Sequence, residues 1–331
     1  MQFAQDLVCP LCHGDIVEQP SQLVCEGCGA DFPIVYGIPD MRPRVARSVY
    51  YDDPAELADL AEAATRLTFE ELERYAFGEA SAFQALYRQA AEQRGEDHWG
   101  EAERMAGGSP VATHNLALDI GCGPGGNLVG LARRFGRSYG VDVNFKLLIL
   151  AKRRLEQRGL ADRTMVVAAS GDALPFAKGT FDYITAMNVI EHVEDQRGML
   201  EEIHRVLFED GALFFDSPNR FTLLPEPHVK VWGVGFLPRA WADPYVRWRK
   251  GIGYEGKRLL SLLELRGMMR RQFRDAFQIS LPSYEQRTYY PEGRAKKLAR
   301  HAYNGVFRRL PVTRQALFPF VPTYNVLAWK K

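Results

Sequence analysis

Four of the five cysteines lie within the first 28 residues, as the pairs Cys9/Cys12 and Cys25/Cys28. Each pair can place two thiolates on one ion, and four thiolates in a tetrahedral array favour Zn²⁺ at a closed structural site. A segment this small buries little core, so the ion would supply its folding energy. A redox or iron–sulfur site is the alternative. His13 could also ligate, but four cysteines already fill the shell, so we expect it on the surface.

A glycine-rich turn is the second candidate site. Gly121, Gly123 and Gly125 stand between a predicted apolar strand and a predicted helix. Glycine lets the backbone turn sharply and approach a ligand closely, and the start of a helix leaves N–H groups free for an electronegative group. Asp142 lies near the end of the next predicted strand, where an acid suits the two hydroxyls of a ribose. These residues predict a site for a nucleoside-containing cofactor.

Four motifs in residues 116–219 indicate which nucleoside-containing cofactor binds at this site. LALDIGCGPGG, GVDVN, SGDALPFAKGTFDYITAMNVIEHV and EEIHRVLFEDGALFFDSPN follow in the order of class I S-adenosylmethionine (SAM)-dependent methyltransferases, and they resemble most the quinone-biosynthesis subgroup. The spacing GxGxG, in place of GxGxxG, and the acidic turn at Asp172 disfavour NAD. The resemblance implies SAM as cofactor, with these contacts: Asp119, Gly121, Gly123 and Gly125 to the methionine part, Asp142 to the ribose, Asp172 and the Ala173 N–H to adenine, and Asn188 near the methyl donor. Asp119 could instead be a structural acid that holds the turn.

The cysteine segment also resembles a known module. CPLC…CEGCGADFPIVYGIPDM is similar to the zinc ribbon of the small activator subunits of tRNA and protein methyltransferases, with Phe32 in place of the usual Tyr. That module is also found fused in front of methyltransferase domains. The resemblance therefore implies structural Zn²⁺ at the cysteines and hints at a methyl-donor cofactor further along the chain.

Glu191 and His192 are candidate catalytic residues at the end of the fourth predicted strand of this domain. In some small-molecule O-methyltransferases and RNA-end methyltransferases, an E-x-x-E-H run binds a divalent metal. Here Asn188 stands in the first position, and a hard cation usually wants more oxygen ligands than Glu191 alone offers. We expect Glu191 to open the following helix and His192 to shape the pocket. The alternative is His192 as a general base, for which its unperturbed pKa is suitable.

Strands and helices alternate from residue 115, which is typical of a parallel sheet with helices on both faces. We predict an α/β fold with a Rossmann-like, seven-stranded, mostly parallel sheet. The predicted strands are 116–120, 138–143, 164–169, 181–188, 212–216, 277–281 and 323–329; the predicted helices are 55–72, 79–93, 127–135, 146–158, 196–207, 258–273 and 296–310. The predicted domains are a zinc ribbon (1–42), a helical layer or linker (43–114) and a methyltransferase domain (115–331) with substrate-binding insertions at about 219–275 and 282–321.

The segment after the fifth strand lies where an acceptor should bind. It is rich in proline and therefore rigid, and it offers Asn219, Arg220, Glu226 and His228 as polar contacts. Tryptophans and arginines are interleaved just beyond it. They fit three roles: stacking on RNA, resting on an anionic bilayer to reach a lipid-linked acceptor, or packing on the domain with arginines over aromatic faces.

The formal net charge of +1 conceals an asymmetry: residues 51–103 hold 14 acids and 4 bases, and residues 280–331 hold 10 bases and 2 acids. This fits an anionic substrate, an anionic membrane or RNA, or else pairing of the two regions within one fold. No apolar run has the length of a membrane span, and no signal-peptide core is present, so we expect a cytoplasmic protein.

These observations predict a SAM-dependent methyltransferase that acts on a small-molecule, lipid-type or glycan-type biosynthetic intermediate. One alternative is an rRNA or tRNA base methyltransferase. Another is a non-catalytic partner in which the zinc module and SAM fold serve only for binding.

Overall fold

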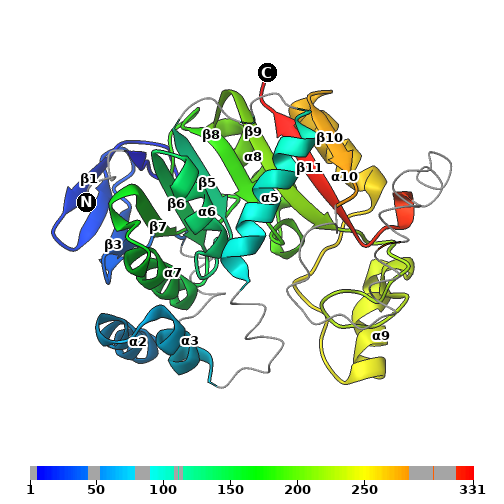
Figure 1. Ribbon diagram of the computed structural model, residues 1–331, viewed down its shortest axis with the longest axis horizontal. Helices are drawn as coiled ribbons and strands as arrows, with labels where there is room; N and C mark the ends of the chain where they lie inside the picture. The colour runs from blue at the N-terminus through cyan, green and yellow to red at the C-terminus, as the bar shows by residue number, and fades with distance from the viewer. Residues whose placement is uncertain are drawn as a thin grey trace.

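Seven strands form the central sheet, in the order β10-β11-β9-β8-β5-β6-β7 (Figure 1). The computed structural model describes residues 6–43, 53–78, 90–107, 111, 115–282, 301 and 318–331. The strands of this sheet are β5 (Leu116–Ile120), β6 (Arg137–Asp142), β7 (Thr164–Ala168), β8 (Phe181–Ala186), β9 (Leu207–Pro218), β10 (Phe277–Ser280) and β11 (Thr323–Trp329). The five strands β5 to β9 are parallel, whereas β11 runs antiparallel to β9 and β10. The predicted Rossmann-like, mostly parallel fold is confirmed.

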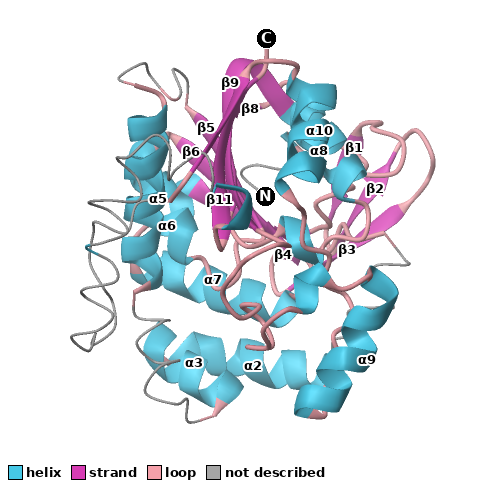
Figure 2. Cartoon of the chain, turned by 90° about the vertical axis from the view of Figure 1, so that its right-hand side faces the viewer, coloured by secondary structure: helices cyan, strands magenta, loops and turns pink. Residues whose placement is uncertain are grey.

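Helices cover both faces of this sheet (Figure 2). One face carries α5 (Ala91–Met105), α6 (Gly126–Arg134) and α7 (Phe145–Gln157), and the other carries α8 (Gln196–Val206) and α10 (Leu262–Phe273). Because both faces are covered, strands such as β7 and β8 are buried along their whole length, which explains their near-continuous apolar sequences. The 3₁₀ segments are η2 (Ala161–Arg163), η3 (Ile190–His192), η4 (Val234–Phe236) and η6 (Phe318–Phe320).

The helix starts follow from side-chain caps. Asn144 caps α7 by accepting from the Leu147 N–H, and Asp195 caps α8. The helix predicted from residue 258 begins only at Leu262, because Ser261 forms a capping box with Glu264.

The N-terminal ribbon is a separate antiparallel sheet of β1 (Ile16–Gln19), β2 (Gln22–Cys25), β3 (Asp31–Val35) and β4 (Ile38–Pro39). It lies beside β7, on the left of Figure 1. The Met41 N–H donates to the Ala168 carbonyl at 2.8 Å, and the Val8 N–H donates to the Pro175 carbonyl at 3.0 Å. Leu23 and other ribbon side chains share a hydrophobic core with the large sheet. The ribbon is therefore attached to the strand edge that leads into the Asp172 turn.

The helical layer differs from the prediction. A single helix over 55–72 is wrong: the chain forms α2 (Pro54–Arg66) and α3 (Phe69–Phe77), because Thr68 starts a new helix through a capping box with Glu71. Of the predicted helix at 79–93, residues 79–89 lie outside the described residues, and α5 begins at Ala91.

Acids of this layer form ion pairs with bases of the domain behind them. Glu56 pairs with Lys146 on α7, and Glu92 lies 2.9 Å from Nε of Arg158. The acidic segment therefore pairs with bases of α7 and of Arg158 just after it. Its predicted pairing with the basic C-terminal segment falls mostly on residues 283–317, which lie outside the described residues apart from residue 301.

The C-terminal part departs from prediction at three places. The strand expected at 212–216 is longer, because β9 already begins at Leu207. Its pairing with β8 is irregular in this first part, where Asp210 has a left-handed backbone (φ 65°). The structure adds α9 (Arg239–Lys250), which lies away from the sheet (Figure 1). The helix predicted at 296–310 lies outside the described residues apart from residue 301. No helix in the described ranges has the length and apolar character that crossing a bilayer requires.

Candidate cofactor and acceptor site

The glycine turn joins β5 to α6 at the carboxyl edge of the sheet, where open α/β sheets bind ligands. Gly121 has φ +67°, and a Cβ there would lie 2.3 Å from Cγ2 of Val189. Gly125 is the N-cap of α6 with φ +77°. At Gly123 an added Cβ would meet no atom within 4 Å among the described residues, so its backbone borders open space. The turn thus exposes backbone at the start of a helix.

Asp142 lies at the end of β6, directly beside this turn. Its Oδ2 accepts from the Gly123 N–H at 2.9 Å and its Oδ1 accepts from the Asn144 N–H at 2.8 Å. Each oxygen keeps a second lone pair that can accept from a hydroxyl. Burial raises the pKa of Asp142, while these N–H groups and the nearby Arg42 guanidinium oppose the rise. The carboxylate is held in place and can still accept from a diol.

Asp119 contributes a buried, incompletely bonded carboxyl group. It is 2% exposed, and its Oδ1 accepts from Nδ2 of Asn127 at 2.9 Å. Its Oδ2 has no hydrogen-bond partner among the described residues. Burial raises the pKa of Asp119 to about 7. A buried oxygen without a partner costs free energy that a cationic or N–H-bearing ligand group would recover, so the amino acid part of SAM fits this position.

Hydrogen bonds within the acidic turn after β7 occupy some of its polar groups. The Ser170 hydroxyl donates to Oδ1 of Asp172, and the Ala173 N–H donates to the Ser170 carbonyl at 3.1 Å. The Ala173 N–H therefore already has an intramolecular partner in this structure. Its contact to adenine, like that of Asp172, stays a prediction.

Asn188 follows β8 in a left-handed conformation with φ 56°. Its N–H donates to Oδ1 of Asp216, near the end of β9. Burial raises the pKa of Asp216 to about 7. Asp216 was not among the predicted site residues, although an acid near a strand end is the signal that selected Asp142. The bond fixes the backbone of Asn188 next to β9, and the Asn188 side chain is exposed.

Glu191 and His192 lie in η3, and the structure brings His228 from the long loop beside them. Nε2 of His192 is 3.9 Å and Nε2 of His228 is 3.7 Å from Oε1 of Glu191. Glu226 Oε1 lies 2.6 Å from Nδ1 of His228. The expectation that Glu191 opens the next helix is wrong, because α8 starts at Gln196 after its cap Asp195. Glu191 is instead 1% exposed and points inward.

Glu191 and Glu226 raise the pKa of His228 to about 9, whereas burial lowers the pKa of His192. The two imidazoles therefore experience different environments although their ring centroids are 5.1 Å apart.

A cavity of about 310 Å³ adjoins this cluster. Arg220 and Glu226 line it together with α9 and the 254–259 segment; its apolar lining residues are Leu224, Val234, Leu237, Ala242, Tyr254 and Leu259. Arg220 is positioned by donating from Nε to the Gly235 carbonyl and from Nη2 to the Leu237 carbonyl, both at 3.0 Å. The cavity thus has the size and mixed lining of a small-molecule site.

Asn219, a predicted substrate contact, is fully buried. Its Nδ2 donates to the carbonyls of Pro319 (2.9 Å) and Val321 (2.7 Å), and its Oδ1 accepts from the Phe221 N–H. In this structure Asn219 ties the acceptor loop to the segment before β11. A contact with the acceptor is untested.

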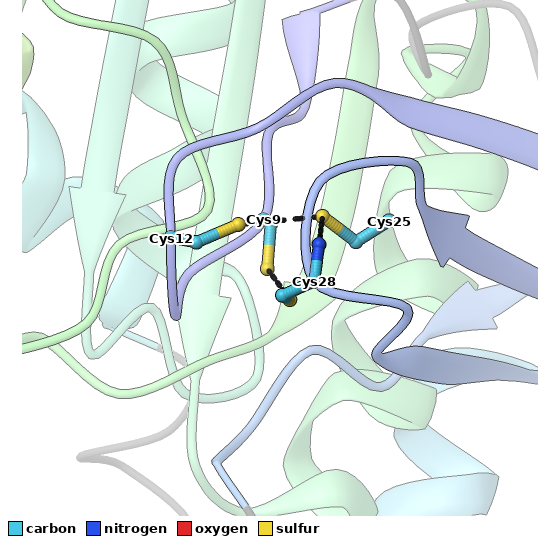
Figure 3. A group of neighbouring side chains, drawn as sticks. All are labelled: Cys9, Cys12, Cys25 and Cys28. Atoms are coloured by element: carbon cyan, nitrogen blue, oxygen red, sulfur yellow. Dashed lines mark hydrogen bonds between the residues drawn. The ribbon is translucent and has the colours of Figure 1, made fainter.

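The four cysteines of the ribbon converge (Figure 3). The Sγ atoms of Cys9 and Cys28 are 3.7 Å apart and those of Cys12 and Cys25 are 3.4 Å apart. All four thiol sulfurs lie within 4.8 Å of one another. The backbone N–H of Leu11 donates to the Cys9 sulfur, which is the polarity a thiolate requires. The geometry fits a structural zinc ion held by four thiolates.

Comparison with known proteins agrees with this geometry. Residues 118–215 match the family described as "Methyltransferase domain". Methyltransferase GfsG of Streptomyces halstedii is 30% identical over 165 residues, which are 50% of this chain and 47% of that protein. The ubiquinone biosynthesis O-methyltransferase of Methylococcus capsulatus is 33% identical over 106 residues, 31% of this chain and 44% of that protein. The chain therefore spans about half the length of these relatives.

Among solved structures, a S-adenosylmethionine dependent methyltransferase from Mesorhizobium loti is similar, with a TM-score of 0.46 and 18% identity; the match covers 71% of this chain and 98% of that one. Residues 118–215 thus match the methyltransferase domain family, and the order of the strands and the acids around the glycine turn agree with that match.

Proposed function

We propose that the protein transfers a methyl group from SAM to a small-molecule acceptor bound in the cavity lined by Glu226 and α9. The observation that carries this proposal is the unpartnered, buried Oδ2 of Asp119 beside the open backbone at Gly123. Asp142 supplies a diol acceptor next to it. The proposed domains are a ribbon at 1–42, a helical layer at 43–114 and the methyltransferase domain at 115–331.

The reaction needs orientation more than strong acid–base chemistry. When bound, SAM supplies a methyl group on a sulfonium, whose transfer is downhill and requires the acceptor to approach in line. We assign the positioning of the donor to Asp119, Asp142 and Asn188. His192 is 42% exposed and its ring lies 5.1 Å from that of His228, so we assign it to activating the acceptor.

The acceptor is of the quinone or lipid type in our proposal. Trp232, Trp241 and Trp248 expose 61%, 67% and 77% of their surfaces, all on the part of the chain that surrounds the cavity. Exposed tryptophans suit contact with a lipid-type molecule or a membrane interface. The curated relatives that act in ubiquinone biosynthesis support this class.

Two measurements test the proposal. Calorimetry should show SAM binding, and Asp142→Asn should weaken it about tenfold or more, since it removes a charged acceptor. Methyl-labelled SAM should then transfer its label into the organic phase of a cell extract incubated with the protein.

Label in purified RNA instead, with binding that falls steeply as salt rises, would favour the base-methyltransferase alternative. SAM binding without label in any fraction would leave the non-catalytic alternative, and the absence of SAM binding would refute the proposal.

A further inference from the structure

Glu191, His192 and His228 form a cluster in which one ligand atom from each residue lies within 4.8 Å of the others. Glu191 is 1% exposed, and neither of its carboxylate oxygens has a hydrogen-bond partner among the residues that the structure describes. Burying a carboxylate without a hydrogen bond is costly, so this group favours a cation beside it. The nearest imidazole nitrogens, at 3.7 and 3.9 Å from Oε1, are within ion-pair distance but beyond hydrogen-bond distance, and this spacing also suits ligand atoms that share one ion.

The third residue of the cluster is oriented by a second carboxylate. Oε1 of Glu226 lies 2.6 Å from Nδ1 of His228, and its Oε2 accepts from the N–H groups of His228 (2.8 Å) and Val229 (2.7 Å). Because an ionised carboxylate only accepts, Nδ1 of His228 carries a proton towards Glu226, and Nε2 is the nitrogen that faces Glu191. A carboxylate behind an imidazole in this way is the usual support of a metal-binding histidine.

The η3 segment, which supplies Glu191 and His192, is fixed to the segment around Arg258. The Arg258 N–H donates to the Glu191 carbonyl at 2.8 Å. Nε2 of Gln196 donates to the carbonyls of Ile190 (2.7 Å) and Arg258 (2.8 Å). Arg258 and Glu226 also line the cavity. The cluster is therefore a preformed feature at the junction of the cofactor edge and the acceptor cavity.

We propose that Glu191, His192 and His228 bind one divalent transition-metal ion. Two imidazoles and one carboxylate suit Zn²⁺, Mn²⁺, Co²⁺ or Fe²⁺ better than Mg²⁺ or Ca²⁺, which prefer oxygen ligands. Three protein ligands leave positions open for an oxygen of the acceptor, whose hydroxyl the ion would make more acidic. This last role rests on the proposed methyl transfer; the binding of the ion does not.

Binding is tested with Mn²⁺ on the full chain, after a weak chelator has removed any metal from the second site while the four-thiolate ribbon keeps its zinc. Electron paramagnetic resonance should show about one Mn²⁺ removed from solution per chain. Glu191→Gln and His228→Ala should abolish this binding, and Glu226→Gln should weaken it about tenfold or more. Glu194→Gln, an exposed neighbour outside the cluster, should bind like the wild type.

Thermal melting distinguishes a lost site from a lost fold. Mn²⁺ should raise the Tm of the wild type and of Glu194→Gln but not that of a folded Glu191→Gln protein. Equal Mn²⁺ and Co²⁺ binding by wild type and Glu191→Gln, or no binding of either ion by the wild type, would overturn the proposal.

Metal dependence of methyl transfer separates this inference from the proposed function. Loss of labelled product after removal of the second metal, with SAM binding unchanged, supports the acceptor role. A protein that binds Mn²⁺ through Glu191 but does not bind SAM would retain the metal site and refute the methyltransferase proposal.

Discussion

Arg42, at the end of the ribbon, donates from Nη1 to the backbone carbonyl of Val143 at 2.7 Å. Val143 directly follows Asp142, the expected ribose acceptor. Arg42 is 6% exposed, and its Nε and Nη2 donate to Asp40 at 2.9 and 3.0 Å. The guanidinium thus connects the ribbon to the loop that follows the Asp142 carboxylate. Its positive charge lowers the pKa of Asp142, whereas burial raises it.

Arg42→Met should weaken SAM binding. The substitution removes a donor to a partly buried carbonyl and a positive charge near Asp142, a loss of about 1–3 kcal/mol, or roughly tenfold to a hundredfold in Kd. Calorimetry with SAM measures this change. Arg66→Met, on an exposed turn of α2, is the matched control; equal affinities for the two variants would contradict the predicted role of Arg42.

Asp119→Asn should stabilise the protein without SAM, in a pH-dependent way. The pKa of Asp119 is raised from 3.8 to about 7 by burial, so between these values the unfolded chain loses a proton that the folded protein keeps. Wild-type stability should fall as pH rises through this interval, by ~1.4 kcal/mol per pKa unit, and then level off. Asparagine cannot ionise, and it keeps the acceptor for Asn127.

The measurement is Tm without SAM at several values between about pH 4 and pH 8. The advantage of Asp119→Asn over wild type should grow with pH and become constant above about pH 7, of the order of a few kcal/mol. Asp162→Asn, on the exposed η2 segment, should follow the wild type. A constant difference at every pH would show that Asp119 is not the group responsible.

Cys25→Ser should remove zinc and unfold the ribbon. The purified wild type should contain about one zinc per chain in the ribbon, because four thiolates complete a closed site. Metal analysis and proteolysis of residues 6–43 measure the loss. Cys122→Ala, at the buried cysteine of the glycine turn, should keep its zinc; a wild-type ribbon that is folded without metal would contradict the prediction.

His192→Ala should lower turnover about a hundredfold without changing the Kd for SAM, since we assign this side chain to activating the acceptor and not to holding the donor. Single-turnover rates with labelled SAM, combined with calorimetry, separate the two effects. His204→Ala, on α8 against Phe273, is the control. Unchanged turnover would contradict this role and leave His192 as a residue that only shapes the pocket.

The sequence predicts the sheet well because strands that are buried on both faces leave continuous apolar runs. The prediction for β5 agrees with Leu116–Ile120, and that for β11 agrees with Thr323–Trp329. The break between α2 and α3 was missed although Thr68 and Glu71 form a recognisable capping box. The helix α9 was missed because Pro244 lies inside it and only Val246 is buried, which leaves little apolar periodicity.

A site residue could be predicted where its own type and its position in the sequence indicate its role. Asp142 is recognisable from its position near a strand end, and Asp216 could have been found in the same way. The contacts of Arg42 with Val143 and of His228 with Glu191 depend on how distant segments fold back. No local pattern encodes such contacts, so they require the structure.

The attachment of the ribbon to β7 and to Val143 has a thermodynamic consequence. If zinc orders the ribbon and thereby holds Arg42 in place, zinc occupancy and SAM affinity are linked. Linkage is reciprocal, so SAM must strengthen zinc retention by the factor by which zinc strengthens SAM binding. Metal supply would then set the cofactor affinity of an enzyme whose zinc lies outside the reaction centre.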